Sequence, residues 1–203
     1  MRQPTDLLLL QARLDEAASG KFIDACAAAA QAWPGATVQR MAWSETAGDA
    51  YGYLALPERT LLDTAGLDAV RAAFAQALPA EAQARVSRLE RALDIAGASA
   101  QARPHFHYVV EMDPEEGWRN ELQSWYDTEH MPGLAAVPGS IRATRLLNHD
   151  HGPLSLACYD LVSTETLGSL PWLAVRASDW SSRVRPHFTN TRRTMFRTLG
   201  LSD

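Results

Sequence analysis

The chain has 203 residues, of which 46% are hydrophobic and 21% charged, a composition typical of a globular protein with a buried core. Its net charge of −5 excludes an overall basic field that would attract nucleic acid or an anionic membrane surface. No apolar run approaches the ~20 residues that a membrane-spanning helix needs, so we expect neither a nucleic-acid nor a membrane partner.

Cys26 and Cys158 are the two cysteines, and their separation offers neither a disulfide framework nor a zinc-binding spacing. The apolar run of residues 7–10 is too short for the core of a signal peptide. Both observations favour a reducing, cytoplasmic location.

The first half of the chain predicts the order strand, helix, strand, strand, helix, strand. β-branched, aromatic and other apolar residues predict strands at 6–14, 36–43, 51–56 and 85–93. Helical spacing predicts one helix between Asp15 and Trp33 and a second over 61–78, which Pro79 ends.

The second half predicts the same order. Strands are expected at 104–112, 140–147, 154–162 and 190–199, and helices at 115–130 and 164–185. Ser163 or Thr164 can cap the last helix, and Pro171 divides it into two. The polar loop 149–152 is predicted to be a solvent-exposed turn.

The halves also correspond in detail, since Trp33-Pro34-Gly35-Ala36 matches Val137-Pro138-Gly139-Ser140 in position and character. We therefore predict two copies of one domain, at residues 1–97 and 103–203, joined by a small polar linker at 96–101. The predicted fold class is α+β, with two ferredoxin-like βαββαβ repeats. Their bare antiparallel sheets would pack face to face as a pseudo-dimeric α/β barrel around a cavity.

The strand at 105–112 has two chemically different faces. One face is apolar and suits a covering layer of helices: Phe106, Tyr108, Val110 and Met112. The other is more polar and is predicted to face the enclosed cavity: His105, His107, Val109 and Glu111. A cavity with one apolar and one polar wall is typical of a small-molecule site.

The segment from Trp125 to Gly139 concentrates the chemistry of the chain. Tyr126 and His130 are four residues apart, a spacing that brings side chains together on a helix. Pro132 predicts that this helix ends at or just before His130. A histidine in a last helical turn, beside the carboxylates of Asp127 and Glu129, is expected to have a raised pKa.

The pattern Trp-Tyr-x-x-Glu-His-x-Pro, followed by a Val-Pro-Gly turn into a strand, resembles the dimeric α/β-barrel superfamily of ferredoxin-like domains. Within that superfamily it is similar to EthD-like proteins, whose Tyr-x-x-x-His-x-Pro pattern matches Tyr126, His130 and Pro132. The resemblance covers the second half well and the first half in layout only. It implies a barrel between two sheets, and the superfamily includes cofactor-free monooxygenases, cyclases, dehydratases, lactone isomerases and haem-binding enzymes.

The first functional hypothesis is an enzyme of the acid–base kind, with dehydration, cyclisation or oxygenation of a small molecule as the reaction. His130 would move a proton, and Tyr126 would orient it or bind a substrate oxygen. His105, His107, Glu111, Trp125 and Glu129 are candidate substrate-binding residues. The alternatives are a non-catalytic binding or carrier protein that uses the same cavity, and a structural protein whose cavity is filled by side chains.

The sequence predicts no cofactor and no metal. His105 and His107 share a strand face, but a third ligand would have to come from His130, Glu111 or His187, and ordinary hydrogen bonding is favoured. The match to haem-binding members is poor. The expected partners are a small ligand, aromatic or polyketide-like, and a second copy of the chain in a homodimer.

The last quarter of the chain is locally basic, with arginines at six positions: Arg176, Arg183, Arg185, Arg192, Arg193 and Arg197. This cluster could bind an anionic substrate group. A solvated face or intramolecular ion pairs are the favoured interpretation.

Overall fold

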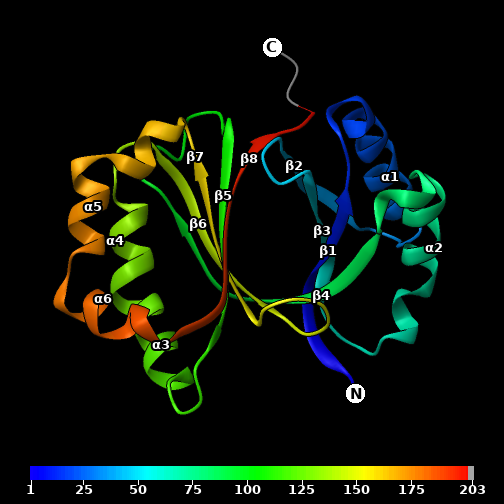
Figure 1. Ribbon diagram of the computed structural model, residues 1–203. Coiled ribbons are helices and arrows are strands. Elements are labelled where there is room, and N and C mark those ends of the chain that lie inside the picture. Colours follow the sequence, from blue (N-terminus) through cyan, green and yellow to red (C-terminus); the bar gives the residue numbers. More distant parts are fainter. Residues whose placement is uncertain (201–203) are drawn as a thin grey trace. The chain divides into compact units, whose positions relative to one another are not determined.

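The computed structural model describes residues 1–200. Its strands are β1 (Gln3–Arg13), β2 (Thr37–Ser44), β3 (Asp49–Leu62), β4 (Arg85–Ala96), β5 (Phe106–Pro114), β6 (Ser140–Asn148), β7 (Ser155–Leu161) and β8 (Phe188–Thr198). Its α-helices are α1 (Ser19–Gln31), α2 (Asp68–Gln76), α3 (Arg119–Trp125), α4 (Met131–Ala135), α5 (Leu170–Arg176) and α6 (Asp179–Val184) (Figure 1). Each of these helices falls short of the length and apolar character that crossing a bilayer requires.

The chain divides into two compact units. Unit 1 comprises residues 1–91, the short segment 148–151 and the end of the chain from Phe196, and unit 2 comprises 92–147 and 152–195. Strands β4 and β8 each begin in one unit and end in the other. The prediction of two repeats at 1–97 and 103–203 concerns duplication of the sequence, and it stays a prediction.

The α+β class is confirmed, and the strands follow the same order in both halves. Hydrogen bonds connect them as β1-β3-β2-β8-β5-β7-β6-β4, and β4 pairs with β1 again, so that the order is closed. The first four strands in sequence are therefore ordered β4-β1-β3-β2, and the last four β8-β5-β7-β6. The strand pairs β1–β3, β1–β4, β2–β3, β5–β7 and β6–β7 are antiparallel.

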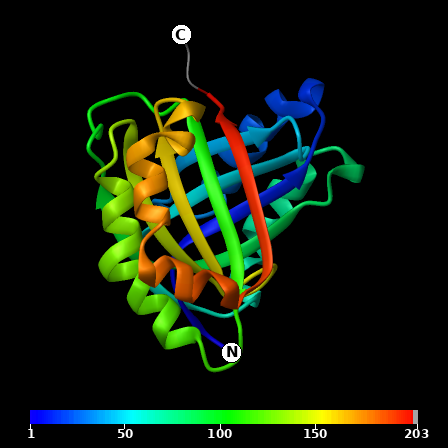
Figure 2. The same ribbon diagram turned by 60° about the vertical axis from the view of Figure 1, so that its left-hand side comes forward.

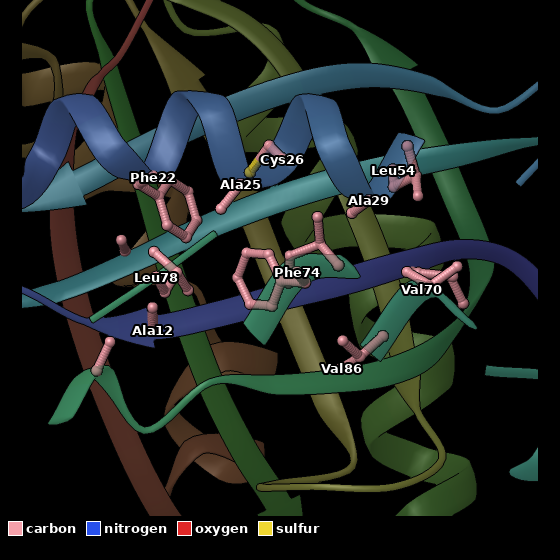
Figure 3. Close-up of a cluster of buried hydrophobic side chains, with 14 of the residues drawn as sticks. Ala12, Phe22, Ala25, Cys26, Ala29, Leu54, Val70, Phe74, Leu78 and Val86 are labelled. Carbon is pink, nitrogen blue, oxygen red and sulfur yellow. The ribbon is translucent and has the colours of Figure 1, made fainter. Parts of the chain in front are cut away.

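The core of unit 1 lies between its sheet and the helices α1 and α2, which cover one face of that sheet (Figures 1 and 3). Phe22 of α1 and Phe74 of α2 pack edge to face, with ring centroids 5.8 Å apart. Gly52 permits this close packing, because a Cβ atom there would lie only 2.6 Å from Cys26 Sγ. Burial raises the pKa of Cys26 to about 12, so this thiol stays protonated and acts as a packing residue.

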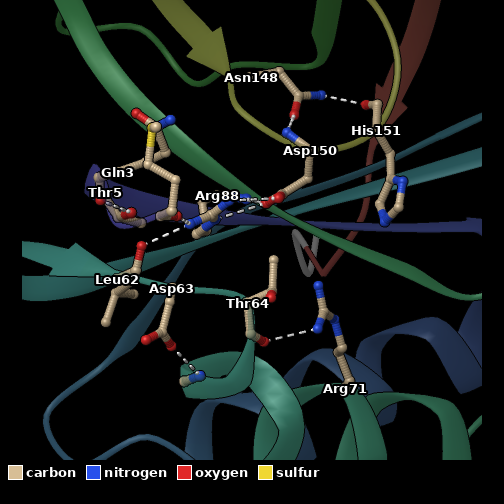
Figure 4. A network of polar contacts seen from close by, with 12 residues as sticks. Gln3, Thr5, Leu62, Asp63, Thr64, Arg71, Arg88, Asn148, Asp150 and His151 are labelled. Carbon is tan, nitrogen blue, oxygen red and sulfur yellow. Dashed lines mark hydrogen bonds and ion pairs between the residues drawn. The ribbon is translucent and has the colours of Figure 1, made fainter.

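Arg88 of β4 is the most heavily bonded buried charge of unit 1 (Figure 4). Its guanidinium donates to both carboxylate oxygens of Asp150, at 2.7 and 3.0 Å, and to the carbonyl oxygens of Leu62 and Met1. Asp150 also accepts from the Arg88 backbone N–H at 2.8 Å. The prediction that loop 149–152 is an exposed turn is therefore wrong for Asp150, whose side chain is only 7% exposed.

In unit 2 the helices α3 to α6 lie over one face of its sheet (Figure 2). Between α3 and α4 the chain forms a π-helical turn over Tyr126–His130, in which the Met131 N–H donates to the Tyr126 carbonyl, five residues back. The predicted end of this helix at His130 is therefore wrong. The wider π turn leaves room for the ring of Pro132, which occupies the first turn of α4 and needs no backbone donor there.

Two further helix boundaries differ from prediction. The helix expected from residue 61 begins at Asp68, because Leu61 and Leu62 pair with β1 instead, and strand pairing overrides their helical spacing. Pro171 lies in the first turn of α5, as predicted, but the cap is Ser169, whose Oγ accepts from the Trp172 N–H at 3.4 Å. Ser163 makes no capping bond, and residues 164–168 form a 3₁₀ turn.

The predicted linker is tied to unit 2 by backbone hydrogen bonds. The N–H groups of Gly97, Ala98 and Ser99 donate to the carbonyls of Ile141, Ala135 and Ser140, each at 2.8 Å. This segment is thus a bonded part of the second sheet and its helix layer, with less freedom than its composition predicts.

Candidate functional site

A partly open pocket lies in unit 2, between the helix-covered face of the sheet and the helices. Its lining comprises Tyr108, Val110, Trp125, Tyr126, His130, Leu134, Tyr159, Trp172, Arg176, Arg185, Phe188 and Arg193. The cavity volume is about 30 Å³, which is room for roughly two water molecules. A larger ligand therefore requires lining side chains to move, and the flexible arginines, which are exposed or half-buried, can do so most easily.

The π turn determines how the central side chains of the pocket meet. Residues five apart align across such a turn, and the imidazole of His130 accordingly stacks on the Trp125 ring, with centroids 4.1 Å apart and planes at 22°. Tyr126 meets His130 edge to face at 5.7 Å, so the predicted contact between these two residues is confirmed. Phe188 stacks against Tyr126 at 6.1 Å and closes this end of the pocket.

The protonation state of His130 is the opposite of the one expected from the sequence. Burial, followed by the positive charges of Arg185 and Arg176, lowers the pKa of His130 to about 3. The histidine does not lie in a last helical turn, so no helix dipole raises its pKa. His130 is therefore a neutral imidazole at neutral pH, and its Nδ1 atom has no hydrogen-bond partner within residues 1–200.

Other buried polar atoms around the pocket also lack partners. Among the described residues these are the Tyr159 hydroxyl and the indole N–H groups of Trp125 and Trp172, all on side chains that are at most 1% exposed. Burial raises the pKa of Tyr126 and of Tyr159, so both phenols keep their protons. A buried donor left without an acceptor costs about 1–3 kcal/mol, so several such groups around one hollow indicate a place for a polar ligand.

Three arginines bring positive charge to the same pocket. In the described part of the chain, the guanidinium groups of Arg176, Arg185 and Arg193 have neither an ion pair nor a hydrogen bond. Burial and the neighbouring charges of Arg176 and Arg193 lower the pKa of Arg185, although its guanidinium remains charged at neutral pH. The pocket is thus electropositive and contains no anion of its own.

The remaining predicted residues lie elsewhere in unit 2. His107 and Glu111 are each 3% exposed and lie on the opposite face of β5 from Tyr108, where His107 Nδ1 is 2.7 Å from Asp160 Oδ1. His105 is exposed and precedes β5, and Glu129 accepts a hydrogen bond from Ser178 Oγ at 2.6 Å. The structure therefore does not bring these histidines together with His130 in one cavity.

The residues in and around the pocket do not form a binding site for a metal ion or for haem. Within residues 1–200, no group of three or more His, Cys, Asp and Glu side chains is placed to hold a metal ion. His187 stacks on Trp118 at 3.4 Å and bonds Glu115. His130, stacked on Trp125 beside a cavity of about 30 Å³, does not fit as an axial ligand of a haem.

Sequence reasoning missed the residues that complete the pocket. The alternation of β5 predicts that Tyr108 faces the helices, and it does, but alternation does not show that this face lines a pocket. Tyr159 and Trp172 carry no motif, and their rings meet only through tertiary packing, at 5.2 Å. The cluster of arginines in the last quarter of the chain did indicate a possible anion-binding site. The sequence does not show which of these arginines form ion pairs and which do not.

The sequence matches no protein-family model and none of the curated proteins. Solved structures do match its fold. An anthrone oxidase-like protein superposes with a TM-score of 0.64 at 13% identity, covering 96% of this chain and 92% of the other.

A ferredoxin-fold protein of Listeria monocytogenes, related to antibiotic biosynthesis monooxygenases, gives a TM-score of 0.53 at 5% identity over 98% and 97% of the two chains. A mutant chlorite dismutase from Candidatus Nitrospira defluvii gives 0.57 at 10% identity over 95% and 91%. These likenesses confirm the dimeric α/β-barrel fold with its ferredoxin-like topology. At such low identity they carry no activity over to this chain.

Proposed function

We propose that this protein is a small-molecule enzyme that removes an acidic proton from an aromatic or polyketide-like substrate, with His130 as the proton acceptor. The observation that carries the proposal is the unpartnered imidazole nitrogen of His130 at an aromatic-walled pocket beside three unpaired arginines. The fold neighbours described as oxidase-like and monooxygenase-related make oxygenation the favoured overall reaction.

The proposed step is a proton transfer. The neutral imidazole of His130 takes a proton from an acidic C–H or O–H group, and the electron pair left on the substrate moves onto a carbonyl or phenol oxygen. The developing oxyanion is stabilised by the arginines and by the Tyr159 hydroxyl, which are already in place. Dehydration, cyclisation and oxygenation can all start from such an enolate or phenolate, and oxygenation would additionally consume dioxygen.

This step can be tested separately from any later chemistry. Anthrones and β-diketones are incubated with the protein in D₂O without oxygen, and exchange of their acidic protons is followed by NMR. His130→Ala should slow the enzyme-dependent exchange by about 10²-fold or more, the range of general-base contributions. His151→Ala, which alters an exposed histidine outside unit 2, should have no effect. Exchange no faster than in buffer, for every compound, would contradict the proposal.

A carrier or sensor is the second candidate, and the low pKa of His130 favours it. An imidazole whose pKa is about 3 is a weak base, so in this alternative the histidine only hydrogen-bonds its ligand. Compounds that bind, and bind more weakly to His130→Ala, without any proton exchange would identify this function.

The finer family assignment belongs to the same proposal. We propose an EthD-like protein that arose by tandem duplication, with two ferredoxin-like repeats in one chain. The identical strand order of the two halves supports the duplication. The proposed homodimer is testable by light scattering.

A further inference from the structure

We infer that the pocket of unit 2 binds an aromatic molecule that carries an anionic group such as a carboxylate, with Arg176, Arg185 and Arg193 as its counter-charges. This inference names the substrate class of the proposed enzyme and rests on the proposed function only in taking this pocket as the substrate site. It is carried by three independent observations, namely the unpaired arginines, the unpartnered buried polar atoms and the aromatic walls.

The protein does not neutralise these arginines with its own carboxylates. The nearby acids of unit 2 are engaged elsewhere: Glu121 binds Arg183 at 2.9 Å, and Asp127 binds Arg145 through two hydrogen bonds of 2.8 Å. Glu129 accepts from Ser178. Arg183 and Arg145 show that this part of the chain pairs arginines readily, so three unpaired guanidinium groups at one pocket form a distinct group.

Like charges held together at a partly buried site destabilise the folded chain unless an anion joins them. A guanidinium group matches a carboxylate through two parallel hydrogen bonds and is less strongly hydrated than an ammonium group. A ligand carboxylate would therefore relieve the repulsion and make charge-assisted bonds at the same time.

The rest of the pocket selects an aromatic body for that ligand. Tyr108 and Trp172 lie 6.5 Å apart and Tyr159 and Trp172 5.2 Å apart, both edge to face, while the Trp125–His130 stack forms another wall. The unpartnered Tyr159 hydroxyl and Trp172 N–H are donors for an additional oxygen on the ligand. Because the cavity is small in the present conformation, the arginines must swing outward as the ligand enters.

Anion binding would also change His130. The charges of Arg185 and Arg176 contribute to its depressed pKa, so their neutralisation by a ligand carboxylate should make the imidazole a stronger base. Binding of the correct substrate would in this way prepare its own proton acceptor.

The test measures binding and needs no turnover. Benzoate, salicylate and naphthoate are compared with the neutral analogues benzyl alcohol, phenol and naphthol, by calorimetry and by NMR of the His130 ring. We expect each carboxylate to bind at least about tenfold more tightly than its neutral analogue, as expected for hydrogen bonds to a charged group. Raising the salt concentration should weaken binding of the carboxylates but not of the neutral compounds.

Variants separate the pocket arginines from general charge effects. Arg185→Met and Arg176→Met should each weaken carboxylate binding about tenfold or more, and Arg185→Lys should restore only part of the loss because it lacks the planar fork. Arg183→Met removes a paired arginine outside the pocket and is the matched control, expected to leave affinity unchanged. Thermal melts verify that each variant is folded.

Equal affinity for carboxylates and neutral analogues, no binding by any of the three carboxylates, or equal losses in Arg183→Met and Arg185→Met would overturn the inference. Carboxylate binding that depends on Arg185 without any proton exchange would overturn the proposed enzyme activity and leave this inference standing. Proton exchange by the wild type without any preference for carboxylates over their neutral analogues would overturn this inference and leave the proposed enzyme activity standing.

Discussion

His130 is the residue at which electrostatics and packing meet. Its imidazole is buried against Trp125 and faces positive charge, so the folded protein holds it neutral, whereas the unfolded chain would protonate it below its ordinary pKa of 6.5. A buried base with no partner of its own costs stability, and natural proteins retain such groups mainly at functional sites.

This arrangement predicts a pH dependence of stability. Because the folded pKa is about 3, the unfolded state binds more protons than the folded state between pH 3 and 6.5, and stability should fall as the pH is lowered through this window. The contribution of His130 is about 1.4 kcal/mol per pH unit. Urea unfolding at pH 7 and pH 5 should therefore show a loss about 2 kcal/mol larger in the wild type than in His130→Gln. Equal losses would contradict the depressed pKa.

At the scale of elements, the π turn between α3 and α4 positions the central side chains of the pocket. The Tyr126 carbonyl accepts a hydrogen bond from the Met131 N–H, five residues on, whereas in an α-helix it would accept from the residue four on. The turn places Trp125 and His130 in register and lets the helix continue through Pro132.

Inserting an alanine after the exposed Thr128 should place Trp125 and His130 six residues apart and rotate His130 relative to Trp125 by about one residue, roughly 100°. We expect the stacked pair to separate, the pKa of His130 to rise towards 6.5, and binding of aromatic carboxylates to weaken at least tenfold. Thr128→Ala, which only removes the bond to the Ser124 carbonyl, is the control. An unchanged NMR titration of His130 in the insertion variant would show that the π turn does not position the histidine.

The elements also show what the sequence could and could not predict. The succession of strands and helices along the chain, the helix-facing side of β5 and the Tyr126–His130 contact follow from periodicity, which is local information. The π turn could not be predicted, because the rule that proline ends a helix assumes α-helical hydrogen bonding. The low pKa of His130 could not be predicted from the sequence either, because Arg176 and Arg185 approach the imidazole only in the folded chain. The prediction placed His105 and His107 in the same cavity as His130. Alternation shows that the two faces of a strand differ, but it does not show which face carries a pocket.

At the scale of the whole molecule, each compact unit borrows from the other half of the sequence. Unit 1 contains the segment 148–151, whose Asp150 pairs with Arg88, and the end of β8, where Phe196 packs on Tyr51 with ring centroids 4.7 Å apart. Neither half of the sequence is therefore a complete folding unit.

The Arg88–Asp150 pair should matter more for stability than any exposed ion pair. Asp150→Ala leaves a guanidinium that is 5% exposed without its carboxylate, and breaking a buried pair in this way costs about 3–5 kcal/mol. The matched control is Asp94→Ala, which removes the partner of Arg142 in a pair whose side chains are 25% and 41% exposed and should cost less than about 1 kcal/mol. Chemical denaturation of both variants gives the comparison, and similar losses would show that the buried pair has no special role.

Because unit 1 contains residues 148–151 and Phe196, its folding during synthesis depends on when these later residues are made. Residues 1–91 are synthesised long before Asp150 and Phe196. Until Asp150 has been made, the Arg88 guanidinium of β4 cannot form its ion pair. Unit 2 needs nothing beyond Met195 and, apart from residues 148–151, is continuous from Ala92. Domains usually mature from the N-terminus as they are synthesised. In this protein the N-terminal unit can be completed only after Phe196 has been made, one residue after the Met195 that completes unit 2.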